Sequence, residues 1–312
     1  MPSWNEASAF YDGLDYDLIK SFAISCEQLG YDTLWAPDHF ILGDAMYESW
    51  TLLAAIAAAT QRIRIGPLLL CYSHRNPSLV AKMAATLDVI SGGRLIFGLG
   101  AGWHKTEHLA YGLRWSDEPA RRIHDMIEAI EIVKALWTQE RVTYHGTSFT
   151  TNDAVCNPKP VQKPHPPIWI GGAGEKLLLR AVANYADGWN VPSLSAQEYA
   201  RKLQVLRDHC ERNGREFERI EKSLESRIMV TNDQWELEKI KKWLVSFSSY
   251  NIHAPPPTDI LEKYIIGNSD TCRRRIEEYQ RAGVQHFTLY PLDFPSTRTL
   301  EILSEDIIPS FG

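Results

Sequence analysis

The segment IRIGPLLLCYSHRNPSLVAKMAATLDVISGGRLIF, residues 63–97, contains one complete strand–helix–strand unit. The largely apolar run 63–70 predicts a buried strand, and Asn76-Pro77 supplies an N-cap and a first-turn proline for a helix over 78–90. Ser91-Gly92-Gly93 ends that helix, and residues 94–97 predict the next strand. Strands and helices alternating at these lengths are typical of parallel βαβ units.

The same pattern recurs toward both ends of the chain. An apolar helical stripe over 17–29 leads through Gly30 into a strand at 33–35. Further strands are predicted at 168–170, 189–191 and 284–290. Because the units continue without a break in composition, we predict a single domain over residues 1–312. The fold class is α/β, a (β/α)8 TIM barrel with insertions, and a doubly wound open sheet is the alternative.

Three stretches depart from the alternation. Residues 142–167 predict a small hairpin followed by a proline-rich run, and residues 246–267 predict a second long loop. Such loops are either lids or surface insertions. Residues 1–16 contain no convincing strand, although a barrel needs one before its first helix. We therefore expect that the first strand is missing, which leaves open edges beside the second and eighth strands, and that the true start lies upstream or the chain is truncated.

Composition excludes several classes of protein. The net charge of −6 argues against a nucleic-acid-binding protein, and no segment approaches the roughly 20 apolar residues that a membrane helix needs. The first residues lack the features of a secretory signal. The five cysteines are scattered and never spaced C-x-x-C, which fits a reduced compartment. We expect a cytoplasmic protein with a small-molecule substrate, no nucleic-acid or membrane partner, and a homodimer as an allowed assembly.

Candidate site residues follow the predicted strands, where barrels place their chemistry. His39 follows the strand at 33–35 and is a candidate proton donor or acceptor, although a structural hydrogen-bonding role fits equally. Glu107 is the second acid–base candidate. The run Gly171-Gly172-Ala173-Gly174 opens a helix predicted from residue 176, so its backbone N–H groups are suited to a phosphate. A tight turn that needs glycine only for its backbone angles is the alternative.

Two short motifs suggest other chemistry. Residues 98–103 resemble the dinucleotide-binding fingerprint but lack its last glycine. His104-Lys105-Thr106-Glu107-His108 matches the H-x-x-E-H pattern of a zinc-peptidase class, which also requires a distant third ligand. We therefore expect no metal site, and a zinc peptidase is the disfavoured alternative.

The predicted loops, taken together and in order, resemble the bacterial-luciferase-like family of flavin- and deazaflavin-dependent oxidoreductases. The matching text is LGYDTLWAPDHF at 29–40, AKMAATLDVISGGR at 81–94 and GLGAGW at 98–103, with further similarity at 60–77, 157–172 and 267–283. The resemblance covers nearly the whole chain. It implies a TIM barrel that binds a flavin-type cofactor at the carboxyl ends of its strands.

The resemblance also implies roles for individual residues. Gly171, Gly172, Ala173 and Gly174 would hold the cofactor phosphate, and Asp38 and His39 would face the cofactor ring, with His39 exchanging a proton. Glu107 would be a second acid–base or substrate-orienting group. The remaining implied cofactor contacts are a bulge at Cys71 and Tyr72 behind the ring, and a pocket lining at Trp189 and Asn190. We further predict that the Cys71–Tyr72 peptide bond is cis.

Within the family, Asp-His after the second strand and the text GGAGEK at 171–176 resemble a subgroup that uses the deazaflavin coenzyme F-420. This predicts hydride transfer to or from a small organic substrate. FMN is the alternative cofactor and would permit monooxygenation, and a flavin-binding protein without catalysis is the non-enzyme alternative. Substrate selectivity is expected in the loops at 103–115 and 246–267.

Overall fold

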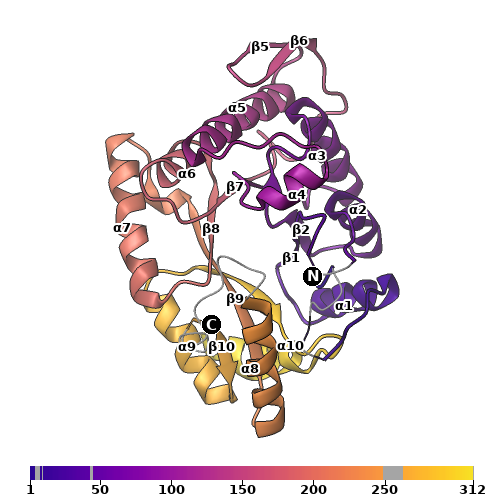
Figure 1. Ribbon diagram of the computed structural model, residues 1–312, viewed down its shortest axis with the longest axis vertical. Coiled ribbons are helices and arrows are strands. Elements are labelled where there is room, and N and C mark those ends of the chain that lie inside the picture. Colours follow the sequence, from indigo (N-terminus) through magenta and orange to yellow (C-terminus); the bar gives the residue numbers. More distant parts are fainter. Residues whose placement is uncertain (4–7, 9, 43–44, 249–262, 312) are drawn as a thin grey trace.

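The computed structural model describes residues 1–3, 8, 10–42, 45–248 and 263–311. Its parallel strands form the wall of a barrel, and its helices lie around the outside (Figure 1). The strands of the wall are β1 (Thr33–Ala36), β2 (Arg64–Pro67), β3 (Leu70–Cys71), β4 (Phe97–Gly100), β7 (Ile168–Gly171), β8 (Gly188–Pro192), β9 (Glu221–Val230), β10 (Ile265–Gly267) and β11 (His286–Pro291). The helices are α1 (Tyr16–Gln28), α2 (Ser49–Ala59), α3 (Pro77–Ser91), α4 (Lys105–Ala110), α5 (Pro119–Thr138), α6 (Leu178–Tyr185), α7 (Ala196–Arg212), α8 (Gln234–Ser248), α9 (Ser269–Arg281) and α10 (Arg298–Ile302).

The strand order confirms the predicted barrel rather than the doubly wound sheet. β1 pairs with β2, and a bridge between Ile65 and Leu95 links β2 to the chain just before β4. The ladder then runs β3, β4, β7, β8 and β9, with β11 also on β9, and every one of these pairs is parallel. The carboxyl ends of all these strands therefore face the same end of the barrel.

The first insertion is the predicted hairpin, formed by β5 (Val142–His145) and β6 (Thr150–Ala154). The buried carboxylate of Glu128 on α5 anchors its turn by accepting the backbone N–H groups of Thr147, Ser148 and Phe149. The second predicted insertion, 246–267, lies mostly outside the described residues.

A gap interrupts the wall where the first strand was expected to be missing. Among the described residues before α1 there is no strand, and in the described part of the chain β1 pairs only with β2 and β11 only with β9. A mostly apolar cavity of about 350 Å³ lies between β1 and β11, and its lining includes Phe22, Leu34, Trp35, Phe287 and Leu289. Within the ranges that the structure describes, no backbone ladder covers these two edges, although the Met1 amino group donates to the Trp35 carbonyl of β1.

Close contacts between strands bring the carboxyl ends together. A Cβ atom on Gly98 of β4 would lie 2.4 Å from the carbonyl oxygen of Pro67 on β2, so only glycine allows this approach. The Arg94 guanidinium, just before β4, donates to the carbonyl oxygens of Ala57, Thr60 and Ile63. It thereby satisfies backbone groups left open where α2 ends.

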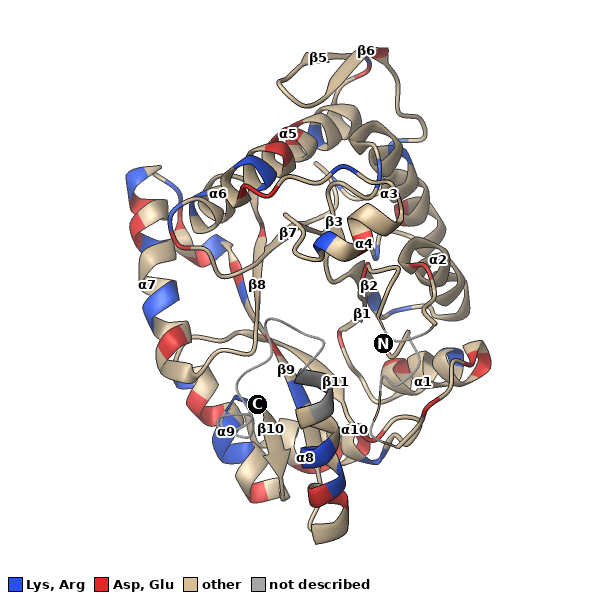
Figure 2. Cartoon of the chain, viewed as in Figure 1, with Lys and Arg blue, Asp and Glu red and all other residues tan. Residues whose placement is uncertain are grey.

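Charged side chains gather on the outer helices, notably α7, α8 and α9 (Figure 2). The largest fully buried side chains include Trp137, Trp169, Trp189, Tyr199 and Phe97. All five cysteines are free and buried. No helix within the described ranges is both long and apolar enough to cross a bilayer.

Candidate active site

A cavity of about 540 Å³ opens at the carboxyl ends of the strands, where the sequence placed the chemistry. Most of the predicted site residues line it: Asp38, His39, Cys71, Glu107, Gly171, Gly172, Ala173, Gly174 and Asn190. The loop after β1, the end of β3, the helix α4, the end of β7 with its following loop, and β8 supply them. Residues far apart in the sequence thus share one pocket, as expected for a parallel barrel.

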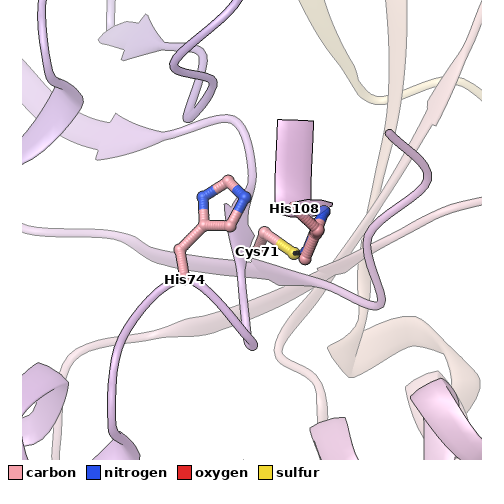
Figure 3. Close-up of side chains that lie close together, drawn as sticks. All are labelled: Cys71, His74 and His108. Atoms are coloured by element: carbon pink, nitrogen blue, oxygen red, sulfur yellow. Dashed lines mark hydrogen bonds between the residues drawn. The ribbon is translucent and has the colours of Figure 1, made fainter. Parts of the chain in front are cut away.

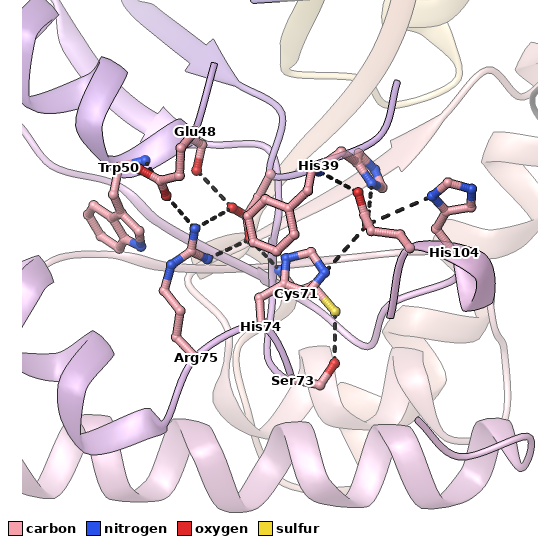
Figure 4. A network of polar contacts seen from close by, with 12 residues as sticks. His39, Glu48, Trp50, Cys71, Ser73, His74, Arg75 and His104 are labelled. Carbon is pink, nitrogen blue, oxygen red and sulfur yellow. Dashed lines mark hydrogen bonds and ion pairs between the residues drawn. The ribbon is translucent and has the colours of Figure 1, made fainter. Parts of the chain in front are cut away.

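Asp38 is buried and lies in a polar network with Cys71, His74 and Arg75, whose side chains Figure 4 shows. Its carboxylate accepts two hydrogen bonds of 2.9 Å from Arg75 and others from the Ser49 hydroxyl, the Cys71 backbone N–H and the His74 Nδ1. Burial opposes ionisation, but the hydrogen bonds from His74 and Arg75 prevail and hold the pKa of Asp38 well below its usual range. Because its oxygens are occupied by protein donors, Asp38 orients neighbouring side chains.

Glu107 on α4 is fully buried and holds His39. Its Oε2 lies 3.0 Å from His39 Nδ1, and its Oε1 accepts the backbone N–H groups of Phe40 and Ile41. Burial disfavours the carboxylate, but the hydrogen bonds from His39 and His74 outweigh it and keep the pKa of Glu107 well below its ordinary value. Glu107 is therefore an ionised group that positions His39, and the second ring nitrogen of His39 remains for a bound molecule.

Cys71, Ser73, His74 and His108 form a second cluster beside this pair. Cys71 Sγ lies 3.4 Å from His108 Nε2 and 3.1 Å from Ser73 Oγ. Burial would raise the pKa of the Cys71 thiol, but hydrogen bonds from His108 and His74 lower it to about 6. Burial likewise opposes charge on His74, but the hydrogen bond to Asp38 and the neighbouring Cys71 and Glu107 groups raise its pKa to about 11. The cluster therefore favours a thiolate next to an imidazolium.

The glycine-rich loop after β7 has the features of an anion site. Gly172 has φ of +129°, which favours glycine, and its N–H is used by the Asn190 carbonyl. The amides of Ala173 and Gly174 donate to no described residue. The buried Lys202 of α7 fixes the loop from outside by donating to the Ala173 carbonyl at 2.7 Å. Free amides close to the start of α6 suit a phosphate group.

Two predicted site residues lie away from the cavity lining. Tyr72 is buried and its hydroxyl reaches Asp125, and Trp189 packs on Tyr199 and donates its indole N–H to the Gly172 carbonyl. Trp189 thus supports the glycine-rich loop from behind. Alternation along β8 explains this, because its neighbour Asn190 points into the cavity instead.

The predicted cis bond at Cys71–Tyr72 is wrong. The non-proline cis bond in the described chain joins Leu68 and Leu69, just before β3. The backbone irregularity therefore falls between β2 and β3, whereas Cys71 is a regular ladder residue paired with Gly100. Both leucines line the cavity, so the bulge occupies the expected region but an earlier position.

The predicted zinc-peptidase pattern is not assembled around one point. His104 Nδ1 lies 3.8 Å from Glu107, close to His39, whereas His108 turns toward Cys71 and Ser73. The pattern therefore divides between two clusters. No site role was assigned from the sequence to His74, Arg75 or His108, nor to Glu225 and Arg227 of β9, which also line the cavity. His74 and Arg75 follow a strand directly, and that position was the available signal.

The fold and this cavity define an α/β-barrel protein with a carboxylate–histidine pair and a glycine-rich loop in one pocket. The chain belongs to the luciferase-like monooxygenase family, whose model matches residues 4–286. The recognised resemblance is thereby confirmed, and the chain is an enzyme of the luciferase-like class.

Relatives in this family use two kinds of cofactor. The chain is 29% identical to an F420-dependent glucose-6-phosphate dehydrogenase of Microbacterium testaceum, over 93% of this chain and 92% of the relative. It is 33% identical to an FMNH(2)-dependent dimethylsulfone monooxygenase of Pseudomonas putida, over 56% of this chain and 48% of the relative. The monooxygenase RslO1 from Streptomyces bottropensis shares the fold, with a TM-score of 0.83, 22% identity and 99% coverage of both chains.

Proposed function

We propose that the protein is an oxidoreductase that uses coenzyme F-420 for hydride transfer to or from a small organic substrate. The observation that carries this is the placement of His39, held by the ionised Glu107, in the same cavity as the glycine-rich loop. His39 can move a proton at a reacting group, and the glycine-rich loop can hold a cofactor phosphate. The F420-dependent relatives that align over nearly the whole chain support this cofactor.

The residues present fit such a cofactor. The cavity of about 540 Å³ has the size of ordinary small-molecule sites, and its wall is smooth where Gly100 and Gly171 replace side chains. A Cβ on Gly171 would lie 1.6 Å from a Leu69 methyl carbon, so this part of the wall depends on glycine. Leu68, Leu69 and Leu70 would contact the cofactor ring, and the amides of Ala173 and Gly174 would hold its phosphate.

The deazaflavin would supply a carrier that accepts or donates a hydride. His39 would take the proton of a substrate hydroxyl as it is oxidised, or return it in the reverse direction. Glu107 would fix the ring orientation and tautomer of His39 through Nδ1, because its carboxylate stays ionised. Asp38 would act indirectly, because it holds the side chains of His74 and Arg75 in place.

An FMN-dependent monooxygenase is the second candidate. The dimethylsulfone monooxygenase relative has the higher identity but matches little more than half of this chain. The F420-dependent relatives align over nearly the whole chain. FMN is therefore the alternative cofactor. A cofactor-binding protein without turnover is the third outcome to test.

Parallel fluorescence titrations of the purified protein with coenzyme F-420 and with FMN test the proposal. We expect tighter binding of F-420 than of FMN. Micromolar binding of FMN with no binding of F-420 would contradict it. A panel of secondary alcohols and sugar phosphates, followed by loss of the oxidised F-420 absorbance, then identifies the substrate class. Binding without turnover on any reductant or oxidant would favour the non-catalytic alternative.

A further inference from the structure

Three side chains with metal-binding atoms meet at one edge of the cavity (Figure 3). They are Cys71 at the end of β3, His74 in the turn that follows, and His108 of α4, and all three are buried. One donor atom from each lies within 4.8 Å of the other two. No metal site was expected from the sequence, because the H-x-x-E-H pattern also requires a distant third ligand and the cysteines are never spaced C-x-x-C.

Both imidazoles are oriented from behind by their Nδ1 atoms. His74 Nδ1 lies 3.2 Å from the Asp38 carboxylate, and His108 Nδ1 lies 2.9 Å from the His104 carbonyl oxygen. These acceptors make each Nδ1 the protonated nitrogen. Each Nε2 is then directed at the cluster, which is the arrangement of metal-binding histidines, whose other N–H usually donates to a carboxylate or a backbone carbonyl.

The anchors of this cluster are rigid. Asp38 accepts the Cys71 backbone N–H at 3.0 Å as well as the His74 side chain, so one carboxylate fixes two of the three groups. Arg75 in turn binds both oxygens of Asp38. Asp38 and Arg75 thus form a set of supporting residues behind the cluster of Cys71, His74 and His108.

The spacing suits a small tetrahedral ion. With zinc–sulfur and zinc–nitrogen bonds of about 2.3 and 2.0–2.1 Å, sulfur and nitrogen ligands stand about 3.6 Å apart. Cys71 Sγ and His108 Nε2 are 3.4 Å apart. His74 Nε2 makes no hydrogen bond to a described residue, and a Glu107 oxygen lies 3.5 Å from it. A metal ion would take the place of the proton on that nitrogen.

Hydrogen bonding alone is the competing explanation of the cluster. Ser73 Oγ lies 2.7 Å from His108 Nε2, so a serine hydroxyl can satisfy that nitrogen without a metal. Ser73 does not account for His74, whose Nε2 still faces the thiol and Glu107 in a buried site. Orphaned buried nitrogens are uncommon in proteins, which favours an additional ligand here.

We infer that Cys71 Sγ, His74 Nε2 and His108 Nε2 bind one borderline transition-metal ion of the Zn²⁺ type. Three protein ligands leave a fourth position, and the three residues line the cavity, so that position faces the substrate space. There the ion would act as a Lewis acid on a substrate oxygen. This inference is independent of which flavin-type cofactor the protein uses.

The test uses the full chain after chelator treatment, without any flavin or deazaflavin. Titration with Co²⁺ should give one bound ion, with a thiolate-to-cobalt charge-transfer band in the near ultraviolet and tetrahedral bands in the visible. Titration with Zn²⁺ against a chromophoric chelator should give 1:1 binding that displaces the cobalt. Cys71→Ser should abolish the charge-transfer band, and both Cys71→Ser and His108→Gln should weaken Zn²⁺ binding at least tenfold.

Two matched controls sharpen the result. Cys156→Ser removes another buried cysteine, whose sulfur contacts only a backbone carbonyl among the described residues, and should leave the metal spectra unchanged. His104→Gln removes a member of the neighbouring His39, His104 and Glu107 group, which also brings three donor atoms together. Circular dichroism spectra matching those of the unaltered protein establish that each variant folds.

Either of two results would overturn the inference. The first is the absence of 1:1 Zn²⁺ binding in the folded, unaltered protein. The second is binding that survives Cys71→Ser and His108→Gln but is lost in His104→Gln, which would place the ion at the neighbouring group. The cofactor titration is a separate measurement. A failed metal titration therefore does not contradict the proposed F-420 function, and a failed F-420 titration does not contradict the metal site.

Discussion

His39 is the residue for which the geometry gives the sharpest expectation of lost activity. Its Nδ1 is taken by Glu107, and it lies on the cavity wall. If it exchanges a proton with substrate, His39→Ala should lower turnover by about 10²–10⁴-fold with cofactor affinity little changed. Steady-state kinetics and cofactor titration measure both quantities. His124→Ala, at an exposed position of α5, is the matched control and should have no effect, whereas unchanged turnover in His39→Ala would make His39 structural.

His74 gives an expectation for the pH dependence of stability. Burial disfavours its charged form, but Asp38 and Cys71 raise its pKa to about 11, above the value of about 6.5 for an unfolded histidine. The folded state therefore binds the proton more tightly, so the stabilisation is complete below about pH 6.5 and is lost as pH rises toward 11. Urea unfolding of the metal-free protein at pH 6 and pH 10 should show a larger deficit for His74→Gln at pH 6. An equal deficit at both values would contradict the raised pKa.

Single residues also mark the limit of what the sequence could predict. His39, Glu107 and the glycines at 171–174 were predictable because each lies at or soon after the carboxyl end of a strand, and a parallel barrel gathers those ends. The meeting of His108 with Cys71 was not predictable. It depends on how the short helix α4 packs over the turn at 71–75, and tertiary packing of this kind leaves no periodic signal.

Strand β4 allows a matched test of close packing at the level of one element. A Cβ on Gly98 would meet the Pro67 carbonyl oxygen at 2.4 Å, whereas a Cβ on Gly100 would meet its first neighbour, Leu69, at an ordinary 3.6 Å. Gly98→Ala should therefore cost about 1–3 kcal/mol of unfolding free energy, because the backbone of β2 must move. Gly100→Ala, two residues along, should cost less than about 1 kcal/mol. Similar midpoints in chemical denaturation for the two variants would count against this close approach of β2 and β4.

Element boundaries were less predictable than element types. The helix after the glycine-rich loop was expected from residue 176, but α6 begins at Leu178. Glu175 binds Lys202 and Arg201 of α7, and the Gly174 carbonyl accepts the Leu179 N–H, so tertiary contacts extend the loop. The bulge at Leu68–Leu69 also lies earlier in the chain than the predicted position at Cys71–Tyr72. The apolar run 63–70 gives no sign of where pairing with β1 ends and pairing with β4 begins.

For the whole molecule, the gap in the wall predicts an alternating pattern of hydrogen exchange. Gln285 donates its N–H to Lys222, and the parallel register then turns the amides of Phe287 and Leu289 toward β9. The amides of His286 and Thr288 face the cavity between β1 and β11. Amide exchange followed by NMR should show these two exchanging faster than their neighbours by at least tenfold. Uniform protection along β11 would mean that its free edge is covered.

The same gap determines how the barrel closes on itself. In the described chain no backbone ladder joins β11 to β1, and side chains span the seam instead, as in the bonds from Tyr31 to the Leu300 carbonyl and from Ser304 to the Leu29 carbonyl, across 269 and 275 residues of chain. Hydrogen bonds of this kind contribute about 1 kcal/mol each. Among the described residues, paired strands are separated by far fewer residues than the groups joined by these two hydrogen bonds. Folding can therefore proceed by adding neighbouring units in turn, and we expect the contacts across this seam to form late and to open early.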